Sequence, residues 1–70
     1  REVDVVLEQD GRIFPVEIKL GSQITETDVR HLRFFAKREE NAGKGAVICS
    51  APHATPFDRS IDIVPLSLIT

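Results

Sequence analysis

The sequence contains a single cysteine and no apolar run that approaches the length of a membrane span. One cysteine excludes an intramolecular disulfide, and Cys49 lies in a short apolar run typical of a buried core position. The first residues also lack the basic and then apolar pattern of a signal peptide. These absences predict a cytoplasmic protein in a reducing compartment, with no membrane contact.

The chain is short for a mixed α/β domain that has neither disulfides nor a structural metal cluster. We therefore expect one core and one domain over residues 1–70. The first strand pattern begins at Glu2, so we interpret the chain as a fragment of a longer protein whose upstream part is missing. No internal repeat, low-complexity tract, linker or Gly-rich phosphate loop is found.

Negative charge is only slightly in excess: the formal net charge is −2, which argues against binding of nucleic acid by bulk electrostatics. The distribution of charge is uneven, because the first ten residues carry four acids and one arginine. Residues 30–44 carry five cations against two acids. This asymmetry predicts an acidic site beside a basic helix.

Two alternating segments, residues 2–8 and 12–20, flank Asp10-Gly11, a strong two-residue hairpin signal. If Gln9 pairs with Arg12, the register places Asp4 opposite Glu17. The same register puts the apolar sides of both strands together, which supports it. The predicted pairs are Glu2 with Lys19, Val3 with Ile18, Val5 with Val16 and Leu7 with Phe14. Pro15 is unusual in such a strand and predicts a non-bonded position, an edge or a bulge.

Like charges directly opposite each other destabilise a sheet, so Asp4 and Glu17 need a compensating feature. A divalent metal ion is one candidate. The alternative is a solvated pair neutralised by Lys19 and Arg12. The residues themselves leave both interpretations open.

The remaining sequence predicts a helix, a buried strand and a short edge strand. Thr25 with Asp28 resembles a helix N-cap, and the helix should run to about Glu40. The run 45–50 reads as a strand parallel to the second one, because a strand, helix, strand order favours a right-handed crossover. Residues 51–60 are expected as a loop and 61–64 as an edge strand. The predicted apolar arc of the helix consists of Val29, Leu32, Phe35 and Ala36. The predicted fold class is therefore α/β, with a compact mixed sheet.

Three strings carry a resemblance to a known family: residues 2–8 (EVDVVLE), 14–19 (FPVEIK) and 28–35 (DVRHLRFF). Together they resemble the C-terminal domain of unknown function that follows the AAA-type ATPase module in many bacterial and archaeal proteins. That domain is similar to the PD-(D/E)XK nucleases. The resemblance implies a restriction-endonuclease-like fold and an ATPase domain in the same longer chain.

The resemblance also implies roles for residues of the hairpin. Asp4 and Glu17 match the metal-binding acids, Lys19 matches the catalytic lysine, and the Ile18 carbonyl would be a further ligand. The implied metal is Mg²⁺ or Mn²⁺, and the implied reaction is hydrolysis of a phosphodiester. Active nucleases of this type commonly add an acid from a preceding helix, which is missing from these residues.

The expected helix carries a second candidate surface. Phe34 projects away from the apolar arc, toward the side of Arg30, Lys37 and Arg38. An aromatic ring among cations would stack on a base of DNA or insert into a protein partner. Two functions therefore stand: a metal-dependent nuclease or DNA-contacting domain, and a noncatalytic module for partner recognition or homodimer formation.

Overall fold

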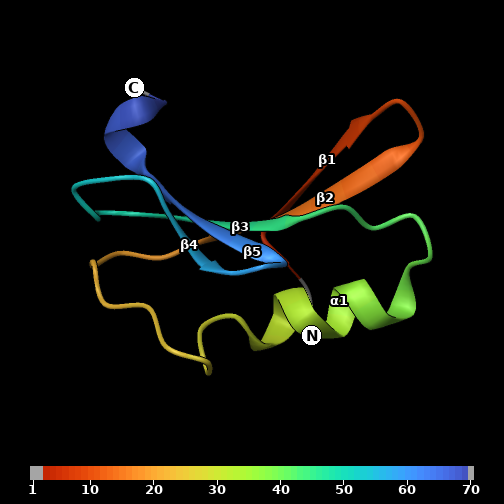
Figure 1. Ribbon diagram of the computed structural model, residues 1–70, viewed down its shortest axis with the longest axis horizontal. Coiled ribbons are helices and arrows are strands. Elements are labelled where there is room, and N and C mark those ends of the chain that lie inside the picture. Colours follow the sequence, from red (N-terminus) through yellow and green to blue (C-terminus); the bar gives the residue numbers. More distant parts are fainter. Residues whose placement is uncertain (1–2, 70) are drawn as a thin grey trace.

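A mixed five-stranded sheet with one helix on one face forms the centre of the molecule (Figure 1). The computed structural model describes residues 3–69. The strand order in the sheet is β1-β2-β3-β5-β4. The elements are β1 (Val5–Gln9), β2 (Arg12–Ile18), α1 (Arg30–Arg38), β3 (Gly45–Cys49), β4 (Thr55–Asp58), β5 (Ile61–Pro65) and a final 3-10 turn, η1 (Leu66–Leu68).

The predicted hairpin and its register are confirmed. Strands β1 and β2 are antiparallel, with Gln9 paired to Arg12 and Val5 to Val16. Asp10 and Gly11 both have positive φ angles, 55° and 82°. A type I′ turn requires that conformation at both central residues, which explains the preference for Asp-Gly.

Pro15 is accommodated inside β2, between two neighbouring strands. In a two-residue hairpin the pair next to the turn is hydrogen-bonded and the pairs then alternate, so Val6 and Pro15 form a non-hydrogen-bonded pair. The Pro15 nitrogen therefore faces β3, whose ladder with β2 starts only at Val16 and Ala46. Proline has no backbone N–H, but the ladder needs no hydrogen bond from this position, so β2 tolerates Pro15.

The core lies between the sheet and α1. Strands β2, β3 and β5 are parallel neighbours, and α1 connects β2 to β3 as the predicted crossover. Buried side chains of the helix region pack against buried side chains of β3 and β5. Cys49 is among them and carries a free thiol, so its predicted core position is confirmed. The buried cluster consists of Val29, Leu32, Val47, Cys49 and Ile61.

Four expectations for the chain after Thr25 were wrong. The expected loop contains β4, and β5 is an inner strand because β4 pairs with its outer side. The helix is shorter than expected, because turns rather than helix occupy the residues between Thr25 and Arg30. Ala36 is exposed rather than part of the buried arc, which consists of Val29, Leu32 and Phe35.

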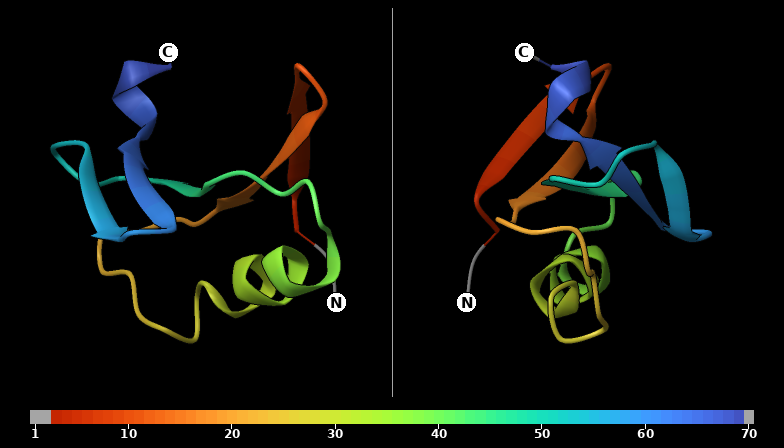
Figure 2. Two further views of the ribbon diagram at one scale, coloured as in Figure 1. Left: turned by 45° about the vertical axis from the view of Figure 1, so that its right-hand side comes forward. Right: turned by 90° about the vertical axis from the view of Figure 1, so that its left-hand side faces the viewer.

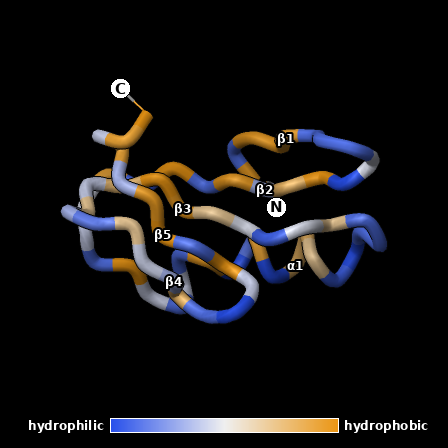
Figure 3. Tube along the Cα trace, turned by 45° about the horizontal axis from the view of Figure 1, so that its top comes forward, coloured by the Kyte–Doolittle hydropathy of each residue, from blue (hydrophilic) through white to orange (hydrophobic). Residues whose placement is uncertain are grey.

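The other face of the sheet is largely apolar, and α1 does not cover it. The β1–β2 hairpin and the C-terminal turn both extend to the side opposite α1 (Figure 2). Apolar stretches follow β1, β2, β3 and β5 in the hydropathy colouring (Figure 3). Leu7 and Ile18, on the predicted apolar side of the hairpin, are 56% and 52% exposed. The alternation thus placed Leu7 and Ile18 on the same face of the hairpin correctly. The core, however, lies on the other face of the sheet, which α1 covers.

The first strand begins later than predicted. Val3 is half-buried and packs against the core cluster instead of continuing the ladder opposite Ile18. Glu2, predicted to face Lys19, lies outside the described residues. Within residues 3–69, no helix has the length and apolar character needed to cross a membrane.

Candidate functional site

The acidic pair predicted from the hairpin lies at the point where β1 leaves the sheet. The Ile18 N–H donates to Asp4 Oδ2 at 2.8 Å, and the Asp4 N–H donates to Glu17 Oε1 at 3.3 Å. Asp4 is a bend residue directly before β1. The Asp4 carboxylate thus accepts a hydrogen bond from the Ile18 N–H. If β1 continued as a strand, a main-chain carbonyl of β1 would accept that hydrogen bond instead. The structure brings Asp4, Glu17 and Ile18 together as predicted.

Glu17 is held in an environment that disfavours its charge. It faces the helix side of the sheet, because it is in register with the buried Val47. Partial burial raises the pKa of the Glu17 carboxyl, and the nearby Asp4 charge raises it further. The Asp4 N–H and His31 oppose this rise. His31 Nδ1, on α1, lies 3.8 Å from Glu17 Oε2.

Lys19 turns toward the segment before the helix rather than toward the two acids. Its Nζ lies 2.7 Å from Asp28 Oδ2. The same Asp28 oxygen accepts hydrogen bonds from the N–H and the hydroxyl of Thr25, at 2.8 and 3.0 Å. Lys19 is the main cause that lowers the pKa of Asp28. Asp28 therefore joins β2 to the turn that leads into α1.

An open pocket of about 400 Å³ lies between the end of β2 and the start of α1, and its lining includes Glu17 and Lys19. Both acidic and basic side chains line it, so it offers both oxygen ligands and cations to a bound group. The lining residues are Glu17, Ile18, Lys19, Leu20, Thr27, Asp28, Arg30 and His31.

Lys19 and Arg12, the cations expected to neutralise Asp4 and Glu17 in the alternative interpretation, do not contact this pair. Lys19 is paired with Asp28. Arg12 starts β2, five residues from Glu17, or about 17 Å along an extended strand. His31 is instead the basic side chain that approaches Glu17.

The donor set fits a hard cation only in part. Mg²⁺ accepts one or two carboxylates together with several waters, and Asp4 and Glu17, which are in contact through the Asp4 N–H, supply one each. The N–H and C=O of a strand residue point to the same neighbour, so the Ile18 carbonyl faces the Asp4 side of β2. No group of three or more His, Cys, Asp or Glu side chains within residues 3–69 is arranged to hold a metal ion.

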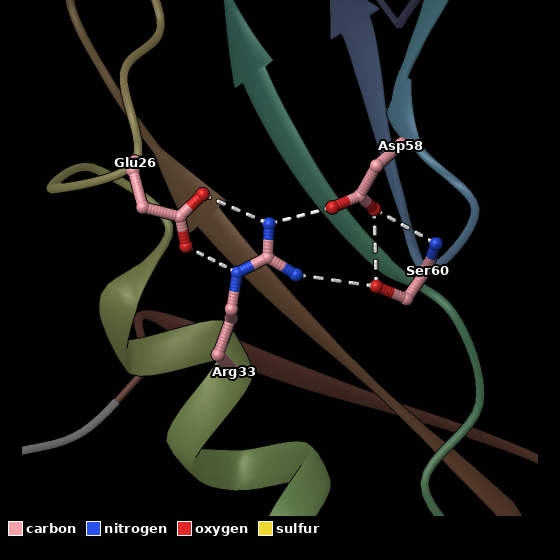
Figure 4. Close-up of polar contacts among 4 residues, drawn as sticks. All are labelled: Glu26, Arg33, Asp58 and Ser60. Carbon is pink, nitrogen blue, oxygen red and sulfur yellow. Dashed lines mark hydrogen bonds and ion pairs between the residues drawn. The ribbon is translucent and has the colours of Figure 1, made fainter.

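A second polar cluster, the Arg33 cluster, lies on the other flank of α1 (Figure 4). The Arg33 guanidinium contacts Glu26 with two nitrogens, and one of them also lies 2.5 Å from Asp58 Oδ2. Asp58 in turn accepts from the N–H and hydroxyl of Ser60, at 2.8 and 3.0 Å. The hydrogen bond from Arg33, followed by that from Ser60, lowers the pKa of Asp58 to about 2. This cluster ties the segment before α1 to the β4–β5 hairpin.

The outer face of α1 carries the predicted contact residues. Arg30, Lys37 and Arg38 are exposed, and Phe34 is 44% exposed. The Arg38 guanidinium lies 5.4 Å from the centroid of the Phe34 ring. The four residues therefore share one surface of the helix, and Arg30 also borders the pocket.

Two ionisable members of the pocket were not predicted as site residues. Asp28 was recognised only as part of a cap, and His31 was not selected. A signal was present, because Asp28 and His31 are three residues apart and side chains with that spacing are neighbours on a helical turn. The sequence did not show that Lys19 and Glu17 would meet that turn, since this depends on how α1 packs on the sheet.

Comparison with known protein families gave one result for this chain. The family model described as "Domain of unknown function (DUF4143)" matches residues 1–69. No curated protein matched the chain, and no solved structure did. Because the family model covers nearly the whole sequence, the chain belongs to the DUF4143 family of domains of unknown function.

Proposed function

We propose that this domain is a metal-dependent, nuclease-like domain that contacts DNA and hydrolyses phosphodiesters at the Asp4–Glu17 pair. The observation that carries the proposal is the direct contact of these two acids, in which the Asp4 N–H lies 3.3 Å from Glu17 Oε1. An acid whose pKa is raised and that lines a pocket, as Glu17 does, is typical of catalytic and binding sites. The resemblance to PD-(D/E)XK nucleases supports the same assignment, including a restriction-endonuclease-like fold and a neighbouring AAA-type ATPase domain.

Each side chain has a distinct role in this proposal. Asp4 and Glu17, with the Ile18 carbonyl, would hold Mg²⁺ or Mn²⁺. The bound ion would polarise a phosphoryl oxygen and lower the pKa of an attacking water. Lys19 would stabilise negative charge that develops on the phosphate. Its contact with Asp28 keeps the ammonium group at the pocket wall.

The test is cleavage of labelled single- and double-stranded DNA by the full-length chain, with Mg²⁺, Mn²⁺ or EDTA. We expect Asp4→Asn and Lys19→Met each to lower the rate by about 10²-fold or more, the size of loss typical of a lost electrostatic group. Glu8→Gln is the matched control, because Glu8 is an exposed acid of the same hairpin. Circular dichroism verifies that each variant is folded.

Calorimetric titration with Mn²⁺ separates binding from catalysis. Wild type should show a site that Asp4→Asn weakens and Glu8→Gln leaves unchanged. A folded wild-type protein that neither binds the ion nor cleaves DNA contradicts the proposal.

The open sheet face favours a second candidate, a noncatalytic module for partner recognition or self-association. Leu7 and Ile18 remain more than half exposed on that face, and large exposed apolar patches mark interaction sites. Sedimentation analysis tests it: Leu7→Lys should abolish association that Glu8→Lys retains. Two results together contradict this candidate. The protein is monomeric at all concentrations, and a pull-down finds no partner whose binding Leu7→Lys weakens.

A further inference from the structure

A stripe of exposed side chains runs along the outer face of α1. Arg30, Phe34 and Arg38 are spaced four residues apart, so they lie above one another on the helix surface. All three are exposed to solvent. The stripe is about 12 Å long, which spans about three nucleotides of a stacked strand.

The stripe carries positive charge that no acidic residue within the helix neutralises. The helix Arg30–Arg38 contains four cationic residues and no acidic one. Arg33 is engaged by Glu26 and Asp58. The remaining cations are thus on the outer surface, where Arg38 contacts Glu39 beyond the end of the helix at 3.1 Å.

Phe34 adds a feature that charge alone does not provide. Its ring is 44% exposed, and the Arg38 guanidinium lies 5.4 Å from its centroid. A base stacked on such a ring gains stacking and cation–π energy. Stacking of this kind requires a base that is not already enclosed in a duplex.

The stripe begins at the candidate pocket. Arg30 lines that pocket together with Glu17, Lys19 and His31. A strand whose phosphates followed the stripe would therefore reach the acidic pair at its N-terminal end. A rigid duplex would meet the same narrow stripe through phosphates only, on a domain whose net charge is −2.

We propose that α1 binds single-stranded nucleic acid and guides it to the pocket lined by Glu17, next to Asp4, with a base stacked on Phe34 and phosphates bound by Arg30 and Arg38. The inference rests on the proposed function and names the substrate class of that site. It predicts a nuclease that acts on single-stranded ends, flaps or gaps rather than on intact duplex.

The test is fluorescence anisotropy of a labelled oligothymidine and of a duplex of equal length, both in EDTA so that nothing is cleaved. We expect the single strand to bind at least about tenfold tighter than the duplex. Phe34→Leu should weaken single-strand binding by about fivefold to 150-fold, the range for loss of one stacked base, whereas Phe34→Tyr should retain it. Equal affinity of Phe34→Leu and wild type, or preferred binding of the duplex, overturns the inference.

Charge is tested separately. Arg30→Gln and Arg38→Gln should each reduce the salt dependence of single-strand binding by about 0.7 in the log–log slope. Arg59→Gln replaces an exposed arginine of the turn between β4 and β5, outside the stripe, and as the control it should leave the slope unchanged. If Arg30→Gln and Arg38→Gln show the same salt dependence of binding as Arg59→Gln, the assigned phosphate contacts are wrong.

The two proposals fail in different ways. Single-strand binding that depends on Phe34, without metal-dependent cleavage, retains the inference and refutes the nuclease. Cleavage of intact duplex that Phe34→Leu does not impair retains the nuclease and refutes the inference. If Phe34→Leu changes self-association but no nucleic acid binds to wild type, the stripe is a protein interface and the inference is wrong.

Discussion

The two polar clusters that flank α1 use carboxylates in opposite ways. In the Arg33 cluster both acids contact the Arg33 guanidinium, and the pKa values of Glu26 and Asp58 are lowered. In the Asp4–Glu17 pair two acids lie together, and the pKa of Glu17 is raised. Complementary charge stabilises the fold, whereas like charge is tolerated where binding or chemistry requires it. The comparison therefore indicates a structural role for the Arg33 cluster and supports the functional role proposed above for the Asp4–Glu17 pair.

The largest expected effect on stability comes from removal of the arginine that holds the structural cluster together. Arg33→Gln leaves Glu26 and Asp58 without their shared cation and detaches the β4–β5 hairpin from the segment before α1. We expect the Tm to fall by about 4–8 °C in thermal unfolding. Lys37→Gln, an exposed cation of the same helix, is the control. If the two variants unfold at the same temperature, the Arg33 cluster is not structural.

Acid should remove the contribution of Asp58 selectively. The pKa of Asp58 is about 2 in the fold against 3.8 ordinarily, so its stabilisation is fully present above pH 3.8 and is lost as the pH falls toward 2. We expect Asp58→Asn to be less stable than wild type at pH 7 and nearly equal to it at pH 2. Thermal unfolding of both proteins across this range measures the difference. A gap in Tm that does not depend on pH contradicts the charge-based explanation.

The smallest expected effect has the opposite sign. The pKa of Glu17 is raised above 4.5. The ionised carboxylate therefore destabilises the fold fully at pH values above the raised pKa, and this destabilisation disappears below pH 4.5. We expect Glu17→Gln to be slightly more stable than wild type at pH 7 and equal to it at acid pH, while activity is lost. Chemical denaturation with Glu8→Gln as the control measures this. A lower stability of Glu17→Gln at pH 7 would show that the pair is structural after all.

The parts of the fold that local patterns specify were predictable. Asp10-Gly11 sets the turn, and the turn sets the register that brings Asp4 to Glu17. The buried strand containing Cys49 and the parallel crossover also follow from sequence. Each of these depends on neighbouring residues or on the handedness of a crossover.

The parts that depend on long-range packing were not predictable. Alternation in β1 and β2 groups side chains by face but does not say which face the helix covers, and Leu7 and Ile18 of the apolar side remained exposed. Strand β4 was missed because Pro56 lies within it and the run is only four residues long. The partners of Glu17 and Lys19 depend on where α1 docks, so His31 and Asp28 were found only in the structure.

The short connection between β1 and β2 also has a consequence for the order of folding. A hairpin with a two-residue turn closes in about 1–10 μs, whereas the parallel pairs require closure of a much longer stretch of chain. We expect protection of the β1–β2 amides before that of β3 and β5 in pulsed hydrogen exchange, and simultaneous protection would contradict this order. The two acids would then meet while the rest of the domain is still unfolded, and the helix would bring the nearby basic side chains to a pair that already exists.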